Sequence, residues 1–350
     1  MIRVGLVGFG MGSRVFHGPL ISSVEGLELA AVVERHTNKA AERYPGIITY
    51  RTLEELLADH SIPLVVIVTP SGSHFELAKR ALEAGKHLVV DKPMCARSGE
   101  ILELIEIAER KGLLLVPFHS RRWDGDYRTL QRLLQDKAVG RVVSFASYYD
   151  RWRPQPKPGA WKEVAQTGSG ILLDLGTHLI DQALELFGLP VEVGAEVLRE
   201  REPLDGADDS FTVRLYYDGM IATVGGNNLS EPSRARYHLR GMGGNYWKFG
   251  MDSQEARLNQ ITRIVGEDWG GEDESKWGRL YTELDGTIAS RPVEAERGDY
   301  RLFYAGVRDA LLGKGEAPVK AEAAWRVARV IEWARESAQE RRVVRCVWNP

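Results

Sequence analysis

The first third of the chain alternates short apolar runs with segments of helix length. Five runs of apolar residues have the continuous character of strands covered on both faces of a parallel sheet. These runs are Ile2–Val7, Leu27–Val33, Leu64–Val68, His87–Val90 and Leu113–Pro117. Helix signals separate them, among them a capping box beginning at Thr52 and the stop residue Gly112. This order predicts a doubly wound parallel sheet with ligands bound at the carboxyl ends of its strands.

After about residue 120 the pattern changes to successive strand-like runs, several of which alternate apolar and polar residues. They are Arg141–Asp150, Val191–Glu200, Ser210–Tyr217, Met220–Gly225 and Ala235–Arg240. We expect helices over about Gly170–Phe187, Asp299–Leu312 and Glu322–Gln339, and loops over Arg151–Gly168 and Gly266–Lys276. These features predict an α+β domain with an antiparallel sheet. At 350 residues the chain exceeds one usual core, so we expect an α/β Rossmann domain over 1–120 and a second domain over 121–350.

Composition excludes several classes of protein. The two cysteines, Cys95 and Cys346, lie far apart and indicate neither a disulfide framework nor a thiolate metal site. The chain lacks an apolar run of membrane-spanning length, so we expect no membrane partner. A net charge of −3 with interspersed acids and bases argues against nucleic acid. The glycine-rich start of the chain does not resemble a secretory signal, and we expect a cytoplasmic protein.

A glycine-rich turn follows the first predicted strand directly. It consists of Gly8, Phe9, Gly10, Met11, Gly12 and Ser13. Glycines let the backbone turn tightly and approach a pyrophosphate, while the next helix directs its first amides at it. Ser13 takes the usual third glycine position, with Gly12 one residue early. The turn predicts NAD or NADP as cofactor, and the alternative is a tight turn without a ligand.

Cofactor preference depends on the end of the second predicted strand. Glu34 can accept hydrogen bonds from the adenosine ribose hydroxyls and would repel a 2′-phosphate, which favours NAD slightly. The adjacent Arg35 could instead bind that phosphate. Thr69, Pro70 and His74 follow the next strand and are expected beside the pyrophosphate and nicotinamide ribose, unless this is a plain strand-to-helix turn with His74 as its cap.

Two further motifs carry chemistry. Asp91-Lys92-Pro93 follows the strand His87–Val90, so Lys92 arrives at the carboxyl edge of the sheet, where nicotinamide would lie. Asp174 and His178 are spaced i and i+4, which puts them on one face of a helix. Taken alone, Lys92 would be read as a solvated lysine before a proline. The pair Asp174 and His178 would be read as an ordinary hydrogen bond on a helix surface or in the core.

Together these motifs resemble the glucose-fructose oxidoreductase, inositol dehydrogenase and rhizopine-catabolism family, abbreviated Gfo/Idh/MocA. The resemblance covers essentially the entire chain, with Asp91 in place of the family's glutamate. It implies a Rossmann domain followed by an open, mostly antiparallel sheet used for substrate binding and oligomerisation. The segments Ser13–Pro19, Phe118–Asp124 and Arg151–Pro154 look most like the branch of NADP-dependent scyllo-inositol dehydrogenases.

The resemblance and the chemistry assign the same roles at the reacting centre. His178 would be general base in alcohol oxidation and acid in reverse, because its ordinary pKa is near neutrality. Lys92 would hold the reacting oxygen and stabilise its negative charge, and Asp174 would orient substrate hydroxyls or His178. The cofactor carries the hydride, so no metal is needed. Asp91, Lys92 and Arg121 complete the expected cofactor contacts.

The expected substrate is a polyol, cyclitol or sugar, since arginine, aspartate and tryptophan suit a ring with several hydroxyls. The candidate substrate-binding residues are Lys92, Arg122, Trp123, Asp124, Arg151, Arg153, Trp161, Asp174 and His178. Each tryptophan could equally be a core residue. An aldose or a cyclic vicinal diol is the alternative substrate.

Two other classes of function stay open. One is a non-catalytic dinucleotide-sensing protein, which would lack the lysine or the histidine. The other is a metal-dependent hydrolase or lyase that uses Asp174, His178, Asp181 and His119 as ligands. Whatever the function, an open antiparallel sheet with aromatic and aliphatic residues on its outer face needs to be covered by another subunit, so we expect a homodimer or homotetramer.

Overall fold

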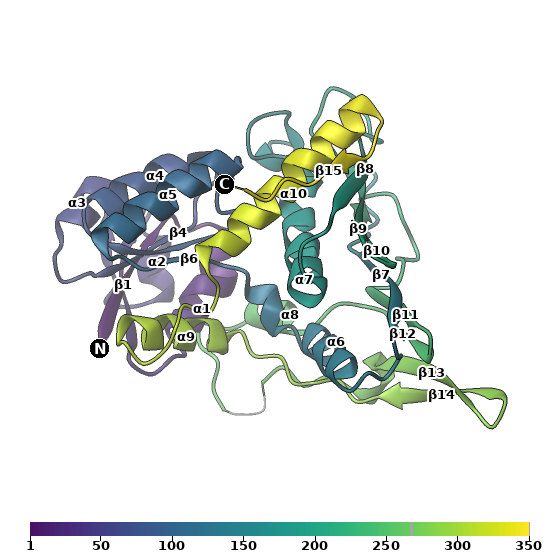
Figure 1. Ribbon diagram of the computed structural model, residues 1–350. Helices are drawn as coiled ribbons and strands as arrows, with labels where there is room; N and C mark the ends of the chain where they lie inside the picture. The colour runs from purple at the N-terminus through teal and green to yellow at the C-terminus, as the bar shows by residue number, and fades with distance from the viewer. Residues whose placement is uncertain (267–268, 350) are drawn as a thin grey trace. The chain divides into compact units, whose positions relative to one another are not determined.

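The computed structural model describes residues 1–266 and 269–349, which form two units (Figure 1). The first unit contains Met1–Trp123, Ser253–Trp269 and Asp299–Trp325. The second contains Asp124–Asp252, Gly270–Gly298 and Arg326–Pro350. Part of the predicted loop Gly266–Lys276, namely Glu267 and Asp268, lies outside the described residues, as does Pro350.

The first unit is built on a parallel sheet of six strands in the order β3-β2-β1-β4-β5-β6. Their bounds are β1 (Ile2–Val7), β2 (Leu27–Val33), β3 (Ile48–Tyr50), β4 (Leu64–Ile67), β5 (His87–Val90) and β6 (Leu115–Pro117). This is the strand order of dinucleotide-binding doubly wound folds. The predicted parallel sheet is confirmed, and only the short, partly exposed β3 lacked a sequence signal.

Helices follow the strands at the predicted signals. They are α1 (Gly18–Ile21), α2 (Lys39–Arg43), α3 (Leu53–Ala58), α4 (His74–Glu83), α5 (Ser98–Lys111), α8 (Gln254–Leu258) and α9 (Arg301–Leu311). The capping box at the start of α3 is confirmed, because Thr52 accepts from the Glu55 amide while the Glu55 side chain accepts from the Thr52 amide. Gly112 ends α5 with a φ of 63°.

The first unit is larger than the predicted 1–120. Tyr300, Phe303 and Tyr304 of the α9 segment are fully buried in the same core as Val4 and Leu6 of β1. The boundary differs from the predicted one because the chain returns to the first unit after residue 252. Local sequence patterns cannot register such a return, since it depends on which apolar faces meet.

The second unit contains a sheet of nine strands in the order β14-β13-β12-β11-β7-β10-β9-β8-β15. Their bounds are β7 (Val142–Tyr148), β8 (Glu192–Leu198), β9 (Ser210–Tyr217), β10 (Met220–Asn227), β11 (Tyr237–Gly241), β12 (Gly244–Lys248), β13 (Gly278–Leu284), β14 (Thr287–Val293) and β15 (Val344–Arg345). Every pair is antiparallel except β7 with β10. The mostly antiparallel sheet is confirmed. The strands that were not predicted include β14, which is exposed along most of its length and therefore lacks alternation.

Helices α6 (Gly125–Gln135), α7 (Thr177–Phe187) and the later part of α10 (Ala321–Glu340) lie on one side of this sheet (Figure 1). Leu179 and Ile180 of α7 are buried with Phe145, Val213 and Val224 of the sheet. None of the described helices has both the length and the apolar character needed to cross a membrane.

Candidate active site

The glycine turn begins where β1 ends. Gly8 has a φ of +97°, a conformation that favours glycine, and its amide donates to the Val33 carbonyl at 3.2 Å. A Cβ added at Gly10 would meet no atom within 4 Å, whereas at Gly12 it would lie 2.9 Å from Val68 Cγ1 and 3.0 Å from Asp91 Oδ2. Gly10 thus leaves room beside the turn, and Gly12 is required by packing. An open backbone cradle at a strand end fits the pyrophosphate of NAD(P).

Ser13 closes the turn in a way that a glycine could not. Its hydroxyl donates to the Gly8 carbonyl at 2.7 Å, and the residue is fully buried. Phe9 packs edge-to-face on Tyr44 with ring centres 6.3 Å apart, while the Met11 side chain is exposed. The departure from the usual third glycine therefore adds a hydrogen bond that fixes the turn.

Glu34 lies at the end of β2 as predicted, but its carboxylate is already engaged. One oxygen accepts from the Thr37 hydroxyl at 2.5 Å and the other from the Ala40 amide at 2.8 Å. The residue is only 6% exposed. Its carboxylate therefore fixes the loop before α2. Each carboxylate oxygen can accept more than one hydrogen bond, so the contact with the ribose hydroxyls stays a prediction.

Exposed bases surround this loop instead. Arg35, His36 and Lys39 are exposed at the carboxyl end of β2. The Arg51 guanidinium donates to the Glu34 carbonyl at 2.8 Å and the Thr37 carbonyl at 2.7 Å. Arg51 was not predicted, because a single arginine after a short strand carries no sequence signal for holding a loop.

His74 joins the loops that follow β4 and β5. Its Nδ1 lies 2.9 Å from the Pro93 carbonyl oxygen and its Nε2 lies 2.8 Å from the Thr69 carbonyl oxygen. Carbonyl oxygens only accept, and which ring nitrogen donates depends on the tautomer. Both ring nitrogens face backbone carbonyls, so His74 holds together the two loops beside Lys92. The cap of α4 is Ser73 rather than His74.

Asp91 anchors the turn that presents Lys92. Its Oδ1 accepts from the Lys92 amide at 2.8 Å and lies 3.8 Å from His17 Nε2. The other nitrogen of His17 lies 2.6 Å from the Tyr304 hydroxyl. Burial opposes ionisation of Asp91, but the nearby His17, followed by the charges of Lys92 and His74, outweighs it and lowers the pKa. The glycine turn, the Thr69 loop and Lys92 thus share one edge of the six-stranded sheet.

Arg121 and Trp123 belong to the interior of the first unit. The Arg121 guanidinium forms an ion pair with Glu255 and donates to the Tyr300 hydroxyl at 3.0 Å. Trp123 packs edge-to-face on Phe303 with ring centres 5.7 Å apart. The core alternative for Trp123 is therefore supported. Arg122 is half-buried, and Asp124 is buried in the second unit.

Asp174 and His178 lie in the second unit, on either side of a change in helix geometry. Asp174 belongs to a π-helical turn over Leu172–Gly176, and His178 lies in the α-helix that follows. Four residues make nearly a full turn in either geometry, so the placement of this pair on one helix face stays a prediction. His178 is 7% exposed, and its ring stands edge-on to Tyr149 with centres 6.4 Å apart.

The predicted loop Arg151–Gly168 is largely irregular in structure. The Arg151 amide donates to the Asn227 carbonyl at 2.9 Å and the Arg153 amide to the Asn228 carbonyl at 2.8 Å. Trp161 begins a short 3₁₀ turn, and the next residue, Lys162, places its ammonium 2.6 Å from Asp174. Lys162 was not predicted, since nothing in the sequence distinguishes it from a solvated lysine.

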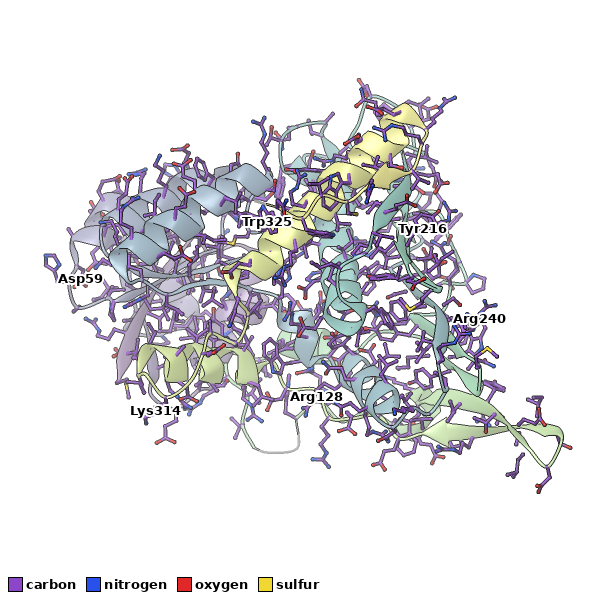
Figure 2. The ribbon with its side chains drawn as sticks, viewed as in Figure 1. Asp59, Arg128, Tyr216, Arg240, Lys314 and Trp325 are labelled. Atoms are coloured by element: carbon purple, nitrogen blue, oxygen red, sulfur yellow. The ribbon has the colours of Figure 1, made fainter. Side chains whose placement is uncertain are left out.

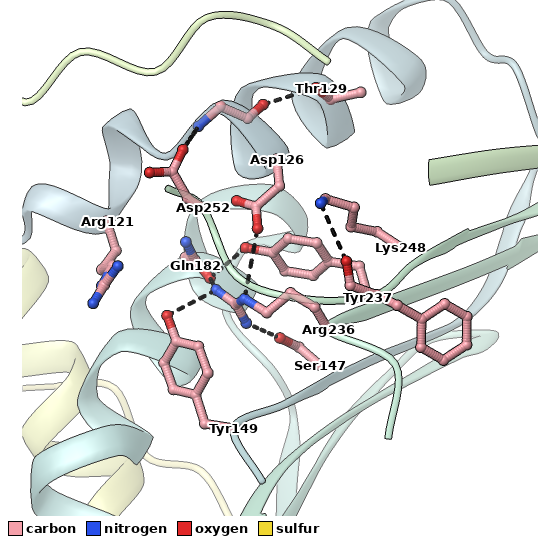
Figure 3. Close-up of polar contacts among 12 residues, drawn as sticks. Arg121, Asp126, Thr129, Ser147, Tyr149, Gln182, Arg236, Tyr237, Lys248 and Asp252 are labelled. Carbon is pink, nitrogen blue, oxygen red and sulfur yellow. Dashed lines mark hydrogen bonds and ion pairs between the residues drawn. The ribbon is translucent and has the colours of Figure 1, made fainter. Parts of the chain in front are cut away.

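A buried polar cluster beside α7 also escaped sequence reasoning (Figure 3). Arg236 donates to the Ser147 hydroxyl at 2.6 Å, the Tyr149 hydroxyl at 3.0 Å and the side-chain oxygen Oε1 of Gln182 at 2.9 Å. Its Nε lies 3.9 Å from Asp126. Burial, partly offset by the Arg236 charge, raises the pKa of Asp126 to about 6. Since Gln182 follows His178 by one helical turn, the cluster fixes the helix that carries the predicted base.

Across the described ranges, no three His, Cys, Asp or Glu residues are grouped so as to hold a metal ion. The metal-dependent alternative built on Asp174, His178, Asp181 and His119 therefore finds no support in this part of the chain.

Comparison with known families agrees with this architecture. Residues 2–119 match a family described as the Gfo/Idh/MocA oxidoreductase family with an NAD-binding Rossmann fold. Residues 127–247 match a Gfo/Idh/MocA C-terminal domain.

Similar proteins extend the match over nearly the whole chain. The chain is 41% identical to YdgJ of Escherichia coli, an uncharacterized oxidoreductase, with 97% of each chain covered. It is 33% identical to IolW of Bacillus subtilis, a scyllo-inositol 2-dehydrogenase (NADP(+)), covering 98% of this chain and 95% of that one. Among solved structures, a Yersinia pestis protein provisionally described as an oxidoreductase superposes with a TM-score of 0.94 at 39% identity, covering 100% of this chain and 98% of that one.

Proposed function

Because the chain belongs to the Gfo/Idh/MocA oxidoreductase family, we propose that it transfers a hydride between NADP(H) and a secondary alcohol or ketone of a cyclitol or sugar. The chain is an oxidoreductase with an NAD(P)-binding Rossmann unit. The observation that carries the proposal is the position of Lys92. It follows a strand of the six-stranded sheet at the edge that holds the open glycine turn.

The residues divide the chemistry as follows. Bound NAD(P) supplies the hydride acceptor at the nicotinamide ring. His178 takes the proton of the substrate hydroxyl and returns it in the reverse reaction. Lys92 stabilises the negative charge that develops on the same oxygen. Asp174 accepts a hydrogen bond from a neighbouring substrate hydroxyl.

NADP(H) is the proposed cofactor for two reasons. The Glu34 carboxylate is buried and bonded to Thr37 and Ala40, so the side chains exposed at this strand end are basic. Arg35 and Lys39 beside it are exposed bases that suit such a phosphate. The NADP specificity in the name of IolW supports the same choice.

A cyclitol is the proposed substrate class because IolW acts on scyllo-inositol and shares 33% identity with this chain. An aldose or cyclic vicinal diol is the alternative, since those compounds present the same adjacent hydroxyls to the same groups.

The test follows absorbance at 340 nm with NAD or NADP and a panel of inositols, aldoses and cyclic diols. We expect Lys92→Met and His178→Asn to lower kcat by about 10²- to 10⁴-fold. NADPH binding, measured by fluorescence titration, should survive in the His178 variant. Turnover that persists in that variant would refute its role, and NADPH binding without turnover of any compound would favour a dinucleotide sensor.

We further propose that a second copy of the chain covers the outer face of the nine-stranded sheet. This face carries Trp247, stacked on His238 with ring centres 3.5 Å apart. Tyr216 and Arg240 lie along the same sheet (Figure 2). Aromatic residues and arginine are enriched at protein interfaces. Light scattering should give an oligomeric mass that Trp247→Glu lowers, whereas the exposed loop variant Trp152→Glu should not. A monomeric parent protein would refute this proposal.

A further inference from the structure

An ammonium, a carboxylate and an indole ring, three groups that proteins use to bind polyols, meet around Lys162 in the second unit. The Lys162 ammonium lies 2.6 Å from Oδ1 of Asp174. The same ammonium lies 5.6 Å from the centre of the Trp161 ring. Trp161 and Asp174 are predicted substrate-binding residues, whereas no sequence pattern predicts the cation beside both of them.

The chain around Lys162 is held in place by its neighbours. The Lys162 carbonyl accepts from the Gly170 amide at 3.2 Å. The carboxylate of the next residue, Glu163, accepts from Arg201 at 2.6 Å, and the Arg201 side chain is only 2% exposed. The Glu163 carbonyl accepts from the Ala207 amide at 3.1 Å. This backbone is therefore anchored, which fixes the point from which the Lys162 side chain extends.

The ion pair lies at the protein surface. The Lys162 side chain is 41% exposed and that of Asp174 is 18% exposed. Pairs this exposed typically contribute only about 0–1 kcal/mol to stability, so stability alone is a weak reason for the arrangement. An ammonium has three N–H donors, and Asp174 takes one of them. The remaining donors can reach a ligand.

A donor beside an acceptor matches the chemistry of adjacent hydroxyls. A hydroxyl both donates and accepts, so one hydroxyl of a ring can donate to Asp174 while its neighbour accepts from Lys162. The flat face of Trp161 can cover the apolar face of the same ring. A compound that lacks one of the two hydroxyls would leave a charged group unsatisfied, and such sites discriminate strongly against deoxy analogues.

We propose that Lys162 is a further substrate-binding residue, which together with Asp174 recognises two adjacent hydroxyls of a polyhydroxylated ring. The inference rests on the proposed cyclitol or sugar oxidoreductase function and deepens it. It follows that every substrate must carry two adjacent hydroxyls next to the carbon that reacts.

The experiment measures kcat and KM for Lys162→Met with the best inositol of the panel and with each of its monodeoxy derivatives. Lys157→Met is the matched control, because Lys157 is an exposed lysine of the same loop. We expect Lys162→Met to raise KM for the inositol by about 10- to 100-fold, the loss of one charge-assisted hydrogen bond, with a small change in kcat. For the derivative that lacks the recognised hydroxyl, parent and variant should have similar KM values. The control should behave as the parent.

Two outcomes would overturn the inference. One is an unchanged KM for the inositol in Lys162→Met. The other is an equal loss on the inositol and all its deoxy derivatives, which would mean that Lys162 only positions Asp174. Lys162→Arg keeps the charge and guards against misfolding, and it should recover most of the affinity. Failure of the parent enzyme to turn over any ring polyol would instead refute the proposed function, and this inference with it.

Discussion

Replacing each of two glycines of the turn by alanine should separate cofactor binding from stability. In Gly12→Ala the new methyl would lie 2.9 Å from Val68 Cγ1 and 3.0 Å from Asp91 Oδ2, closer than ordinary contacts allow. Overpacking of this kind costs about 1–3 kcal/mol of unfolding free energy, or ~2–10 °C in Tm for a unit of this size. In Gly10→Ala the methyl meets no protein atom within 4 Å. The folded protein should therefore keep its Tm.

Gly10→Ala should instead lower the affinity for NADPH. The space beside Gly10 is where we expect the pyrophosphate, so the methyl should hold the phosphates away from the backbone amides. Loss of one charge-assisted hydrogen bond would weaken NADPH binding by about 10- to 100-fold. Differential scanning calorimetry gives Tm and fluorescence titration gives Kd. Parent-like NADPH affinity in Gly10→Ala would refute the assignment of this turn to the cofactor. A parent-like Tm in Gly12→Ala would refute the packing argument.

Three further predictions concern the groups around the candidate site. Arg35→Ala should raise KM for NADP about tenfold and leave KM for NAD nearly unchanged, whereas equal effects on both would exclude a phosphate contact. His74→Leu removes the hydrogen bonding of the ring to the Thr69 and Pro93 carbonyls, and calorimetry should show about 1–3 kcal/mol lower unfolding free energy; an unchanged value would remove its positioning role. The pKa of Asp126 is raised by burial from 3.8 to about 6. Its contribution to the free energy of unfolding is therefore fully present below pH 3.8 and is lost as the pH rises through about 6. Asp126→Asn should therefore gain stability relative to the parent across that interval in urea titrations, and parallel pH profiles would contradict the shift.

Much of the fold could be predicted because it depends on patterns that are local in sequence. Strands β1, β2 and β5 have the predicted bounds, since continuous apolar runs follow from burial on both faces. The capping box at Thr52 and the stop at Gly112 depend only on neighbouring residues. The glycine turn and Lys92 could also be placed, because the carboxyl ends of parallel strands meet at one edge.

Other features depend on contacts between distant segments. The predicted boundary at residue 120 missed the return of Tyr300 and Phe303 to the first core, which only the meeting of apolar faces decides. The partners of Lys162 and Arg236 come from other elements and leave no mark on nearby sequence.

The sequence by itself determined the Rossmann sheet, its glycine turn and the residue types available for hydride-transfer chemistry. It also indicated the family, through Asp91-Lys92-Pro93 and the Asp174–His178 spacing. Tertiary structure alone decided how those side chains are engaged. The Glu34 carboxylate, for example, accepts from the Thr37 hydroxyl and the Ala40 amide. The physical reason is that periodicity and spacing specify where a side chain begins, whereas its partners depend on which donors the folded chain brings within hydrogen-bonding distance.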